Sequence, residues 1–215
     1  MATNLTYESL ARQPASDRNK EPIFQTFQKV FSDKDGQRIL EIASGPGIHV
    51  SHIAPHFPKT RFQPTDLDAN SLGSIQKYID YYKLANVLPP KVVDIATAPS
   101  SWPDLSGFAE PKSVHGILCI NMIHISSNAA VDGLFSAAGQ LLTMDGILFV
   151  YGPMSKNGEM VESNRRFSDS LKARNAEWGV RDTRFLEELA HKNGLKLITI
   201  FDMPANNSVL SFGRI

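Results

Sequence analysis

The segment from residue 39 to residue 50, Ile-Leu-Glu-Ile-Ala-Ser-Gly-Pro-Gly-Ile-His-Val, constrains the fold of this chain most strongly. An apolar run suited to a β-strand leads into a turn with Gly45 and Gly47, and apolar residues at helical spacing follow. Glycine permits a positive φ angle and lets a ligand approach the backbone, because it has no Cβ atom. A strand, a glycine turn and a helix predict the first unit of a doubly wound α/β sheet.

The residues around this turn indicate which ligand it would hold. A dinucleotide fingerprint has a third glycine or an alanine where this chain has Val50. Glu41 places negative charge beside the turn, which opposes a diphosphate and suits a ligand with a free amino group. An acidic residue followed by G-x-G resembles motif I of class I S-adenosylmethionine-dependent methyltransferases, with Ala43 at the usual first glycine. The alternative is an ordinary strand-to-helix turn without a ligand.

Composition limits the classes of protein that remain. The chain has 215 residues, a formal net charge of zero and 42% hydrophobic residues, which favours one globular domain. Balanced charge gives no reason to expect a nucleic-acid partner, and no apolar run reaches the ~18 residues of a membrane span. The single cysteine, Cys119, excludes an intrachain disulfide and gives no metal-binding spacing, so no metal is expected. The N-terminus lacks a signal-peptide pattern, so a cytoplasmic location is expected.

Two aspartates follow predicted strands at the edge where a doubly wound sheet binds its ligand. Asp66 ends a strand at 61–66, about 20 residues beyond the glycine turn, and can accept hydrogen bonds from both ribose hydroxyls. Asp68 is expected to cap the next helix instead. Asp94 ends a strand at 91–94 and can accept a hydrogen bond from an adenine amino group; the alternative is a turn residue.

The strand predicted at 114–120 is apolar on both faces and therefore central in the sheet. It ends at Asn121, which would lie under the sulfonium of the cofactor. His124 is the candidate general base, because the pKa of histidine is ordinarily near the working pH. His49 is the second candidate, and a structural histidine is the alternative for either.

The end of the chain separates two kinds of doubly wound sheet. Strands at 195–202 and 208–213 are joined by too few residues for a helix, so they must be antiparallel. A mostly parallel, seven-stranded sheet that ends in an antiparallel hairpin is the arrangement of class I methyltransferases. A nicotinamide-dependent oxidoreductase, the competing class, would continue with another βαβ unit.

Nearly the whole chain resembles the methyltransferase-like 26 family, a group of predicted S-adenosylmethionine-dependent methyltransferases with no general substrate. The blocks that carry the resemblance are Arg18–Ile23, Glu41–His49, Tyr151–Met154, Asn157-Gly158, Ser163-Asn164 with Phe167, Arg181-Asp182 and Met203–Asn207. The resemblance implies a Rossmann-like fold and S-adenosylmethionine as the cofactor. It also favours a cofactor role for Arg18 and Asn19, in an arm just before the first helix, and Ser44 belongs to the glycine loop that would hold the methionine part.

The predicted protein is a single methyltransferase domain over 1–215, with 1–35 as an arm and helix and 152–180 as an insert on the substrate side. The side chains expected to face the substrate are Tyr151, Met154, Asn157 and Asn164. The activity would be methyl transfer to an oxygen or nitrogen atom of a small-molecule acceptor. The alternative is a non-catalytic protein that binds S-adenosylmethionine as a regulatory partner, and the oligomeric state is left open.

Overall fold

The computed structural model describes residues 6–102, 105 and 107–215 of the chain. It consists of two compact units, one that ends at Val93 and one that begins at Asp94. The elements of the first unit are η1 (Tyr7–Ser9), α1 (Pro14–Val30), β1 (Arg38–Ile42), α2 (Ile48–Ile53), η2 (Ala54–His56), β2 (Arg61–Asp66), α3 (Ala69–Tyr82) and β3 (Lys91–Val92). Residues 1–5 of the predicted arm lie outside the described residues.

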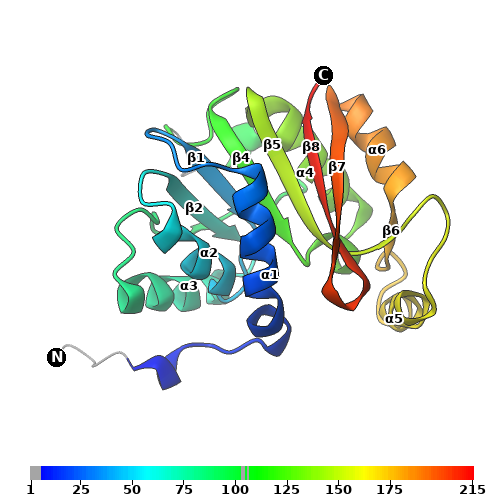
Figure 1. Ribbon diagram of the computed structural model, residues 1–215, viewed down its shortest axis with the longest axis horizontal. Coiled ribbons are helices and arrows are strands. Elements are labelled where there is room, and N and C mark those ends of the chain that lie inside the picture. The colour runs from blue at the N-terminus through cyan, green and yellow to red at the C-terminus, as the bar shows by residue number, and fades with distance from the viewer. Residues whose placement is uncertain (1–5, 103–104, 106) are drawn as a thin grey trace. The chain divides into compact units, whose positions relative to one another are not determined.

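The first unit contains three parallel strands in the order β3, β2, β1. α1 packs against α2, and α2 packs against α3 (Figure 1). The core between α1 and the strands is aromatic: the ring of Phe27 lies 4.9 Å from that of Phe57 and 6.4 Å from that of Phe62. These contacts bury the apolar face that the 3.6-residue spacing of α1 creates.

Helix α1 begins earlier than the sequence predicts. The sequence places Arg18 and Asn19 in an arm before the first helix, but the helix begins at Pro14, so both residues lie inside it. Pro14 occupies the first turn, where a missing N–H group costs little. Pro22 lies in the interior, where proline removes a hydrogen bond, and the Thr26 hydroxyl binds its carbonyl oxygen at 3.1 Å. The packed apolar face sustains the helix across Pro22, so the prediction for its start is wrong.

The second unit holds the remaining strands. Its elements are η3 (Pro99–Ser101), β4 (Val114–Ile120), η4 (Ile123–Ile125), α4 (Asn128–Leu141), β5 (Leu142–Ser155), α5 (Glu162–Lys172), β6 (Arg181–Asp182), α6 (Thr183–Lys192), β7 (Leu195–Met203), η5 (Pro204–Asn206) and β8 (Asn207–Arg214). β5 pairs in parallel with β4 and antiparallel with β8, and β7 pairs antiparallel with β8 (Figure 1). The short β6 pairs in parallel with the end of β5.

The fold class predicted from the sequence is confirmed: helices alternate with mostly parallel strands, and the chain ends in an antiparallel hairpin. The described residues contain eight strands, and the two-residue β6 is the one that the sequence does not predict. No helix in this part of the chain is both long enough and apolar enough to cross a membrane.

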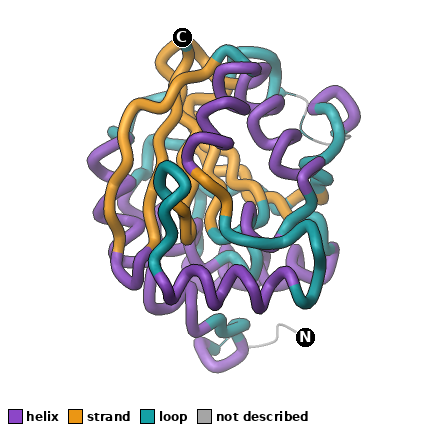
Figure 2. The backbone as a smooth tube through the Cα atoms, turned by 90° about the vertical axis from the view of Figure 1, so that its right-hand side faces the viewer, coloured by secondary structure: helices purple, strands orange, loops and turns teal. Residues whose placement is uncertain are grey.

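Strand β5 runs to Ser155, past the predicted start of the insert at 152, so Met154 is a strand residue. The insert contains α5, whose first turn lies beside the turn between β7 and β8 (Figure 2). The Asn164 amide donates a hydrogen bond of 2.9 Å to the carbonyl oxygen of Asn206, and the Asn206 amide donates one of 3.0 Å to the Ser163 hydroxyl. These bonds fix α5 to the hairpin.

Two glycines of α4 allow close packing of backbone on backbone. A Cβ atom on Gly133 would lie 1.9 Å from the carbonyl oxygen of Ile95, in the segment that follows Asp94. A Cβ atom on Gly139 would lie 2.3 Å from the carbonyl oxygen of Asn193, just after α6. Neither position has space for a side chain, so α4 depends on both glycines for its place in the second unit.

Candidate functional site

The glycine turn after β1 has two glycines with different tasks. Gly45 and Gly47 have φ angles of 57° and 95°, which side chains rarely adopt. A Cβ atom on Gly47 would lie 3.0 Å from Cα of Ile75, so this glycine is required for packing against α3. A Cβ atom on Gly45 would have only one atom within 4 Å, Oε1 of Gln13 at 3.8 Å. Gly45 is therefore the residue of the turn that leaves space beside its Cα atom for a ligand.

Asp66 lies at the end of β2 and connects the turn to the start of α3. One carboxylate oxygen accepts a hydrogen bond of 2.8 Å from the N–H group of Gly45, and the other accepts one of 2.9 Å from the N–H group of Asp68. Each carboxylate oxygen has a second lone pair, so two acceptor positions remain for a ligand. Asp68 caps α3 by accepting from the N–H group of Asn70, which confirms the prediction of a helix cap.

Glu41 is buried near the end of β1, with 2% of its surface exposed. Neither carboxylate oxygen has a hydrogen-bond partner within the described ranges. Burial raises the pKa of Glu41 to about 8, and the negative charge of Asp66 adds to the effect. The nearby Ser44 hydroxyl lowers the pKa in part, although it makes no well-aligned hydrogen bond to the carboxylate. A buried carboxylate without a donor is costly, so a hydrogen-bond donor at this position would stabilise it.

Ser44 forms part of the framework of the turn. Its hydroxyl accepts a hydrogen bond of 3.2 Å from the N–H group of Thr65, and its own N–H group donates to the carbonyl oxygen of Thr65 at 2.9 Å. The Thr65 hydroxyl in turn donates to the carbonyl oxygen of Glu41 at 2.7 Å. The structure thus brings Ser44 together with Glu41, Gly45 and Asp66.

Ala43 stands in the turn with a φ angle of 55°, in the left-handed region. An L-residue there costs roughly 1–2 kcal/mol, whereas glycine adopts the conformation freely but is more flexible when unfolded. Ala43→Gly is therefore expected to raise the melting temperature by about 2–4 °C. Thermal unfolding followed by circular dichroism measures this. Ala15→Gly, in the right-handed conformation of α1, should lower it, and equal effects of the two changes would contradict the strain at Ala43.

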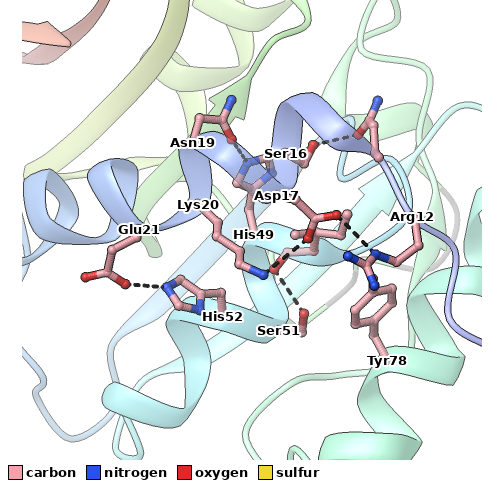
Figure 3. A network of polar contacts seen from close by, with 12 residues as sticks. Arg12, Ser16, Asp17, Asn19, Lys20, Glu21, His49, Ser51, His52 and Tyr78 are labelled. Atoms are coloured by element: carbon pink, nitrogen blue, oxygen red, sulfur yellow. Dashed lines mark hydrogen bonds and ion pairs between the residues drawn. The ribbon is translucent and has the colours of Figure 1, made fainter. Parts of the chain in front are cut away.

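Helix α1 is fixed above α2 by polar contacts that the sequence does not reveal. Nε2 of His49 lies 2.8 Å from Oδ1 of Asn19, so this ring nitrogen donates, and His52 pairs with Glu21 at 2.9 Å (Figure 3). Burial lowers the pKa of His49 to about 4, with a further contribution from nearby positive charge. His49 and Asn19 therefore satisfy each other. Arg18 is exposed, and its side chain makes no hydrogen bond or ion pair to the part of the chain that the structure describes.

The segment before α1 reaches the glycine turn, and sequence reasoning does not single it out. Leu10 is buried against Ile48 and Tyr78, and the Tyr78 hydroxyl donates to the carbonyl oxygen of Ala11 at 2.8 Å. Gln13 ends this segment next to Gly45, so its side chain is a further candidate for ligand contact. A polar, irregular sequence gives no signal of such docking, because the contacts depend on α3.

In the second unit, Asp94 begins a tight turn. Its carboxylate accepts from the N–H group of Ala96 at 2.9 Å, and one oxygen remains without a partner among the described residues. The buried indole of Trp102 donates to the carbonyl oxygen of Asp94 at 3.2 Å and to the Thr97 hydroxyl at 3.1 Å. Asp94 therefore acts as a turn residue, and contact with adenine stays a prediction.

Asn121 and His124 follow β4. Asn121 has a φ angle of 59°, a conformation that asparagine tolerates, and its N–H group donates to the carbonyl oxygen of Tyr151 at 2.9 Å. His124 is buried, and its Nδ1 atom has no hydrogen-bond partner within the described ranges. Burial, with a smaller effect from the positive charge of Arg181, lowers the pKa of His124 to about 4. The expectation of a pKa near neutrality is therefore wrong, because the ring is shielded from water.

Arg181 holds the segment that carries His124. Its guanidinium donates to the carbonyl oxygens of Ile123 at 3.0 Å and Ser126 at 2.9 Å. The His124 ring also contacts that of Phe167 in α5, with 5.6 Å between centroids. The sequence places Arg181 in a block of resemblance but does not predict this role, since β6 brings it here.

A cleft of about 460 Å³ lies at the end of β5, between the turn at 156–161, α5 and the β7–β8 turn. Met154 and Asn164, predicted on the substrate side, both line it. Tyr151 is buried in β5 and Asn157 is an exposed turn residue with a φ angle of 54°; neither lines the cleft. The structure thus brings together two of the four predicted substrate residues.

Comparison with solved structures gives the class of the fold. An O-methyltransferase family protein from Burkholderia thailandensis is 14% identical, with a TM-score of 0.76 over 94% of this chain and 57% of that one. Mitomycin 7-O-methyltransferase is 13% identical, with a TM-score of 0.74 over 94% and 55%. An O-methyltransferase family 2 protein from Planctomyces limnophilus, solved with apigenin, is 15% identical, with a TM-score of 0.74 over 94% and 60%.

The fold is therefore that of class I, Rossmann-like methyltransferases. This chain spans a little over half the length of these structures, and identity at this level shows the fold alone. The chain belongs to the family described as proteins of unknown function, DUF938, which matches residues 11–214.

Proposed function

We propose that this protein binds S-adenosylmethionine and transfers its methyl group to a small-molecule acceptor. The observation that carries the proposal is the buried, unpartnered carboxylate of Glu41 beside the glycine turn. An ammonium group is a donor of three hydrogen bonds and carries the charge that a buried carboxylate requires. The amino group of the methionine part would meet both needs.

The rest of the turn fits the same ligand. Gly45 leaves space beside its Cα atom, and Asp66 retains acceptor positions for the two ribose hydroxyls. Arg18 is the candidate partner of the methionine carboxylate, because its guanidinium is unpaired within the described ranges. Contacts of Asp94 with adenine and of Asn121 under the sulfonium stay predictions.

When bound, S-adenosylmethionine supplies a methyl group that its positively charged sulfur activates. The chain then needs mainly to bind, align and exclude water. His124 is the candidate proton acceptor through Nδ1, which is neutral at pH 7. A pKa of about 4 makes it a weak base, so the general-base role of His124 stays a prediction.

The comparisons support this proposal at the level of fold. One of the similar proteins was solved with apigenin, a small molecule, and the resemblance to the methyltransferase-like 26 family favours the same cofactor. A cytoplasmic location stays a prediction. The competing hypothesis is a protein that binds S-adenosylmethionine without transferring the methyl group.

Calorimetric titration with S-adenosylmethionine and S-adenosylhomocysteine tests the proposal. Wild-type protein should bind both with one site. Asp66→Ala should weaken binding on the order of 100-fold, because hydrogen bonds to a charged acceptor are lost. Asp35→Ala, an exposed aspartate in a turn, is the matched control and should bind as wild type does. Folded wild-type protein that binds neither ligand would refute the proposal.

A further inference from the structure

The cleft at the end of β5 has an apolar floor made by sulfur-containing side chains. Met154 and Met203 are buried there, with 4% and 9% of their surfaces exposed, and the half-buried Met160 forms part of the wall. Methionine is polarisable and adaptable, and its sulfur makes favourable contacts with aromatic rings. Three methionines around one cleft therefore suit a flat ring more than a branched aliphatic chain.

Polar side chains line most of the rest of the cleft, and two of them, Asn164 and Ser208, can bind a ligand hydroxyl. The Asn164 amide nitrogen is engaged with carbonyl oxygens of Met154 and Asn206, which leaves its oxygen as an acceptor. The Ser208 side chain also lines the cleft, and its hydroxyl makes no hydrogen bond to other described residues. A ligand hydroxyl could donate to the amide oxygen and accept from the serine. Polar groups at fixed positions beside the methionines would set the orientation of a small ligand.

Charge at the rim argues against an acidic ligand. Lys156 is the one basic residue among the described residues that line the cleft, and it is paired with Asp202. Glu159 also lies at the rim and has no ion pair with another described residue. A carboxylate or phosphate group would therefore meet a net negative rim.

We propose that this cleft binds the methyl acceptor, and that the acceptor is an uncharged, planar ring compound with a hydroxyl group. A volume of about 460 Å³ accommodates two or three fused rings. This proposal depends on the proposed function in one respect: it identifies the molecule that binds in the cleft as the methyl acceptor. Occupancy of the cleft is tested without methyl transfer.

The methionines provide the readout. The chain has six of them, and three line the cleft. In protein labelled with ¹³C at the methionine methyl groups, 2-naphthol should shift the signals of Met154, Met160 and Met203 along one saturation curve. Met144, which is 66% exposed in β5, should not follow that curve. Single Met→Leu variants assign the signals.

Matched variants locate the binding. Met160→Ala should weaken 2-naphthol binding about fivefold, whereas Met144→Ala should leave it unchanged. Ser208→Ala should also weaken it about fivefold, because one hydrogen bond is lost. The anionic 2-naphthoate should bind at least about fivefold more weakly than 2-naphthol.

The possible outcomes distinguish failure of the acceptor proposal from failure of the proposed methyltransferase function. If S-adenosylmethionine binds but 2-naphthol leaves the three signals unmoved at millimolar concentration, the acceptor proposal is refuted and the function stands. If the signals move in a protein that binds no S-adenosylmethionine, the cleft is a binding site and the function fails. If 2-naphthoate bound more tightly than 2-naphthol, the proposal that the acceptor is uncharged would be wrong.

Discussion

Replacing Glu41 with glutamine is expected to abolish the proton release that accompanies S-adenosylmethionine binding and to lower the affinity at least tenfold. With a pKa of about 8, the carboxyl group of the free protein is mostly protonated at pH 7. An ammonium ligand favours the ionised form, so binding should release between half a proton and one proton, roughly, at pH 7. Titrations at pH 7 in buffers of different ionisation enthalpy measure this number.

Two comparisons make the Glu41 experiment decisive. Glu188→Gln, an exposed glutamate on α6, should keep both the affinity and the proton release of wild-type protein. If Glu41→Gln releases as many protons as wild-type protein, Glu41 is not the group that ionises, and its assignment to the amino group of the ligand fails.

The same residue gives the ligand-free protein a pH dependence. Because the folded-state pKa of Glu41 lies above its ordinary value of 4.5, the folded state holds more protons than the unfolded state between pH 4.5 and about 8. The contribution of Glu41 to the free energy of unfolding therefore falls as pH rises through this range. Glu41→Gln should remove that fall, which urea unfolding at pH 5 and pH 8 would show.

Gly133→Ala is expected to destabilise the protein by about 3 kcal/mol or more, which exceeds most effects of overpacking. The added Cβ atom would lie 1.9 Å from the carbonyl oxygen of Ile95, and backbone cannot move aside as a flexible side chain can. Gly73→Ala in α3 is the matched control, because no atom lies within 4 Å of its Cβ position. It should stabilise the protein by about 0.5–1 kcal/mol through helix propensity.

Urea unfolding measures both glycine variants. A lower midpoint at unchanged slope is expected for Gly133→Ala, since the change acts on the folded state. If both variants shift the midpoint in the same direction, the close packing of α4 on the segment after Asp94 does not limit stability. If Gly133→Ala does not fold, it should be absent from the soluble fraction, while Gly73→Ala is obtained in normal yield. That result would also show strong destabilisation by Gly133→Ala.

Local pattern was sufficient for the parts of the site that depend on neighbouring residues. Short-range spacing is enough to predict four features. These are strand β1, the positive φ angles at Gly45 and Gly47, the position of Asp66 at the end of β2, and the terminal hairpin. The Asp68 cap belongs to the same group, because a cap needs only the helix that it begins.

Contacts made by distant residues were beyond that reasoning. The early start of α1 depends on the packing of its apolar face, which keeps Pro22 inside the helix. The pair between Asn19 and His49 joins positions 30 residues apart. For His124 the residue type was visible but its burial was not, so the sequence suggested an ordinary pKa where the structure gives a low one.

The two hydrogen bonds accepted by Asp66 have a consequence for engineering. One carboxylate orders the glycine turn and the entry to α3, and it is also the candidate ribose contact. The same side chain thus orders the turn and would recognise the ribose. Replacing Asp66 to admit cofactor analogues with an altered ribose would therefore also loosen the turn. Redesign should keep Asp66 and begin at Gln13, which lies beside the turn and accepts from Ser16 within its own helix start.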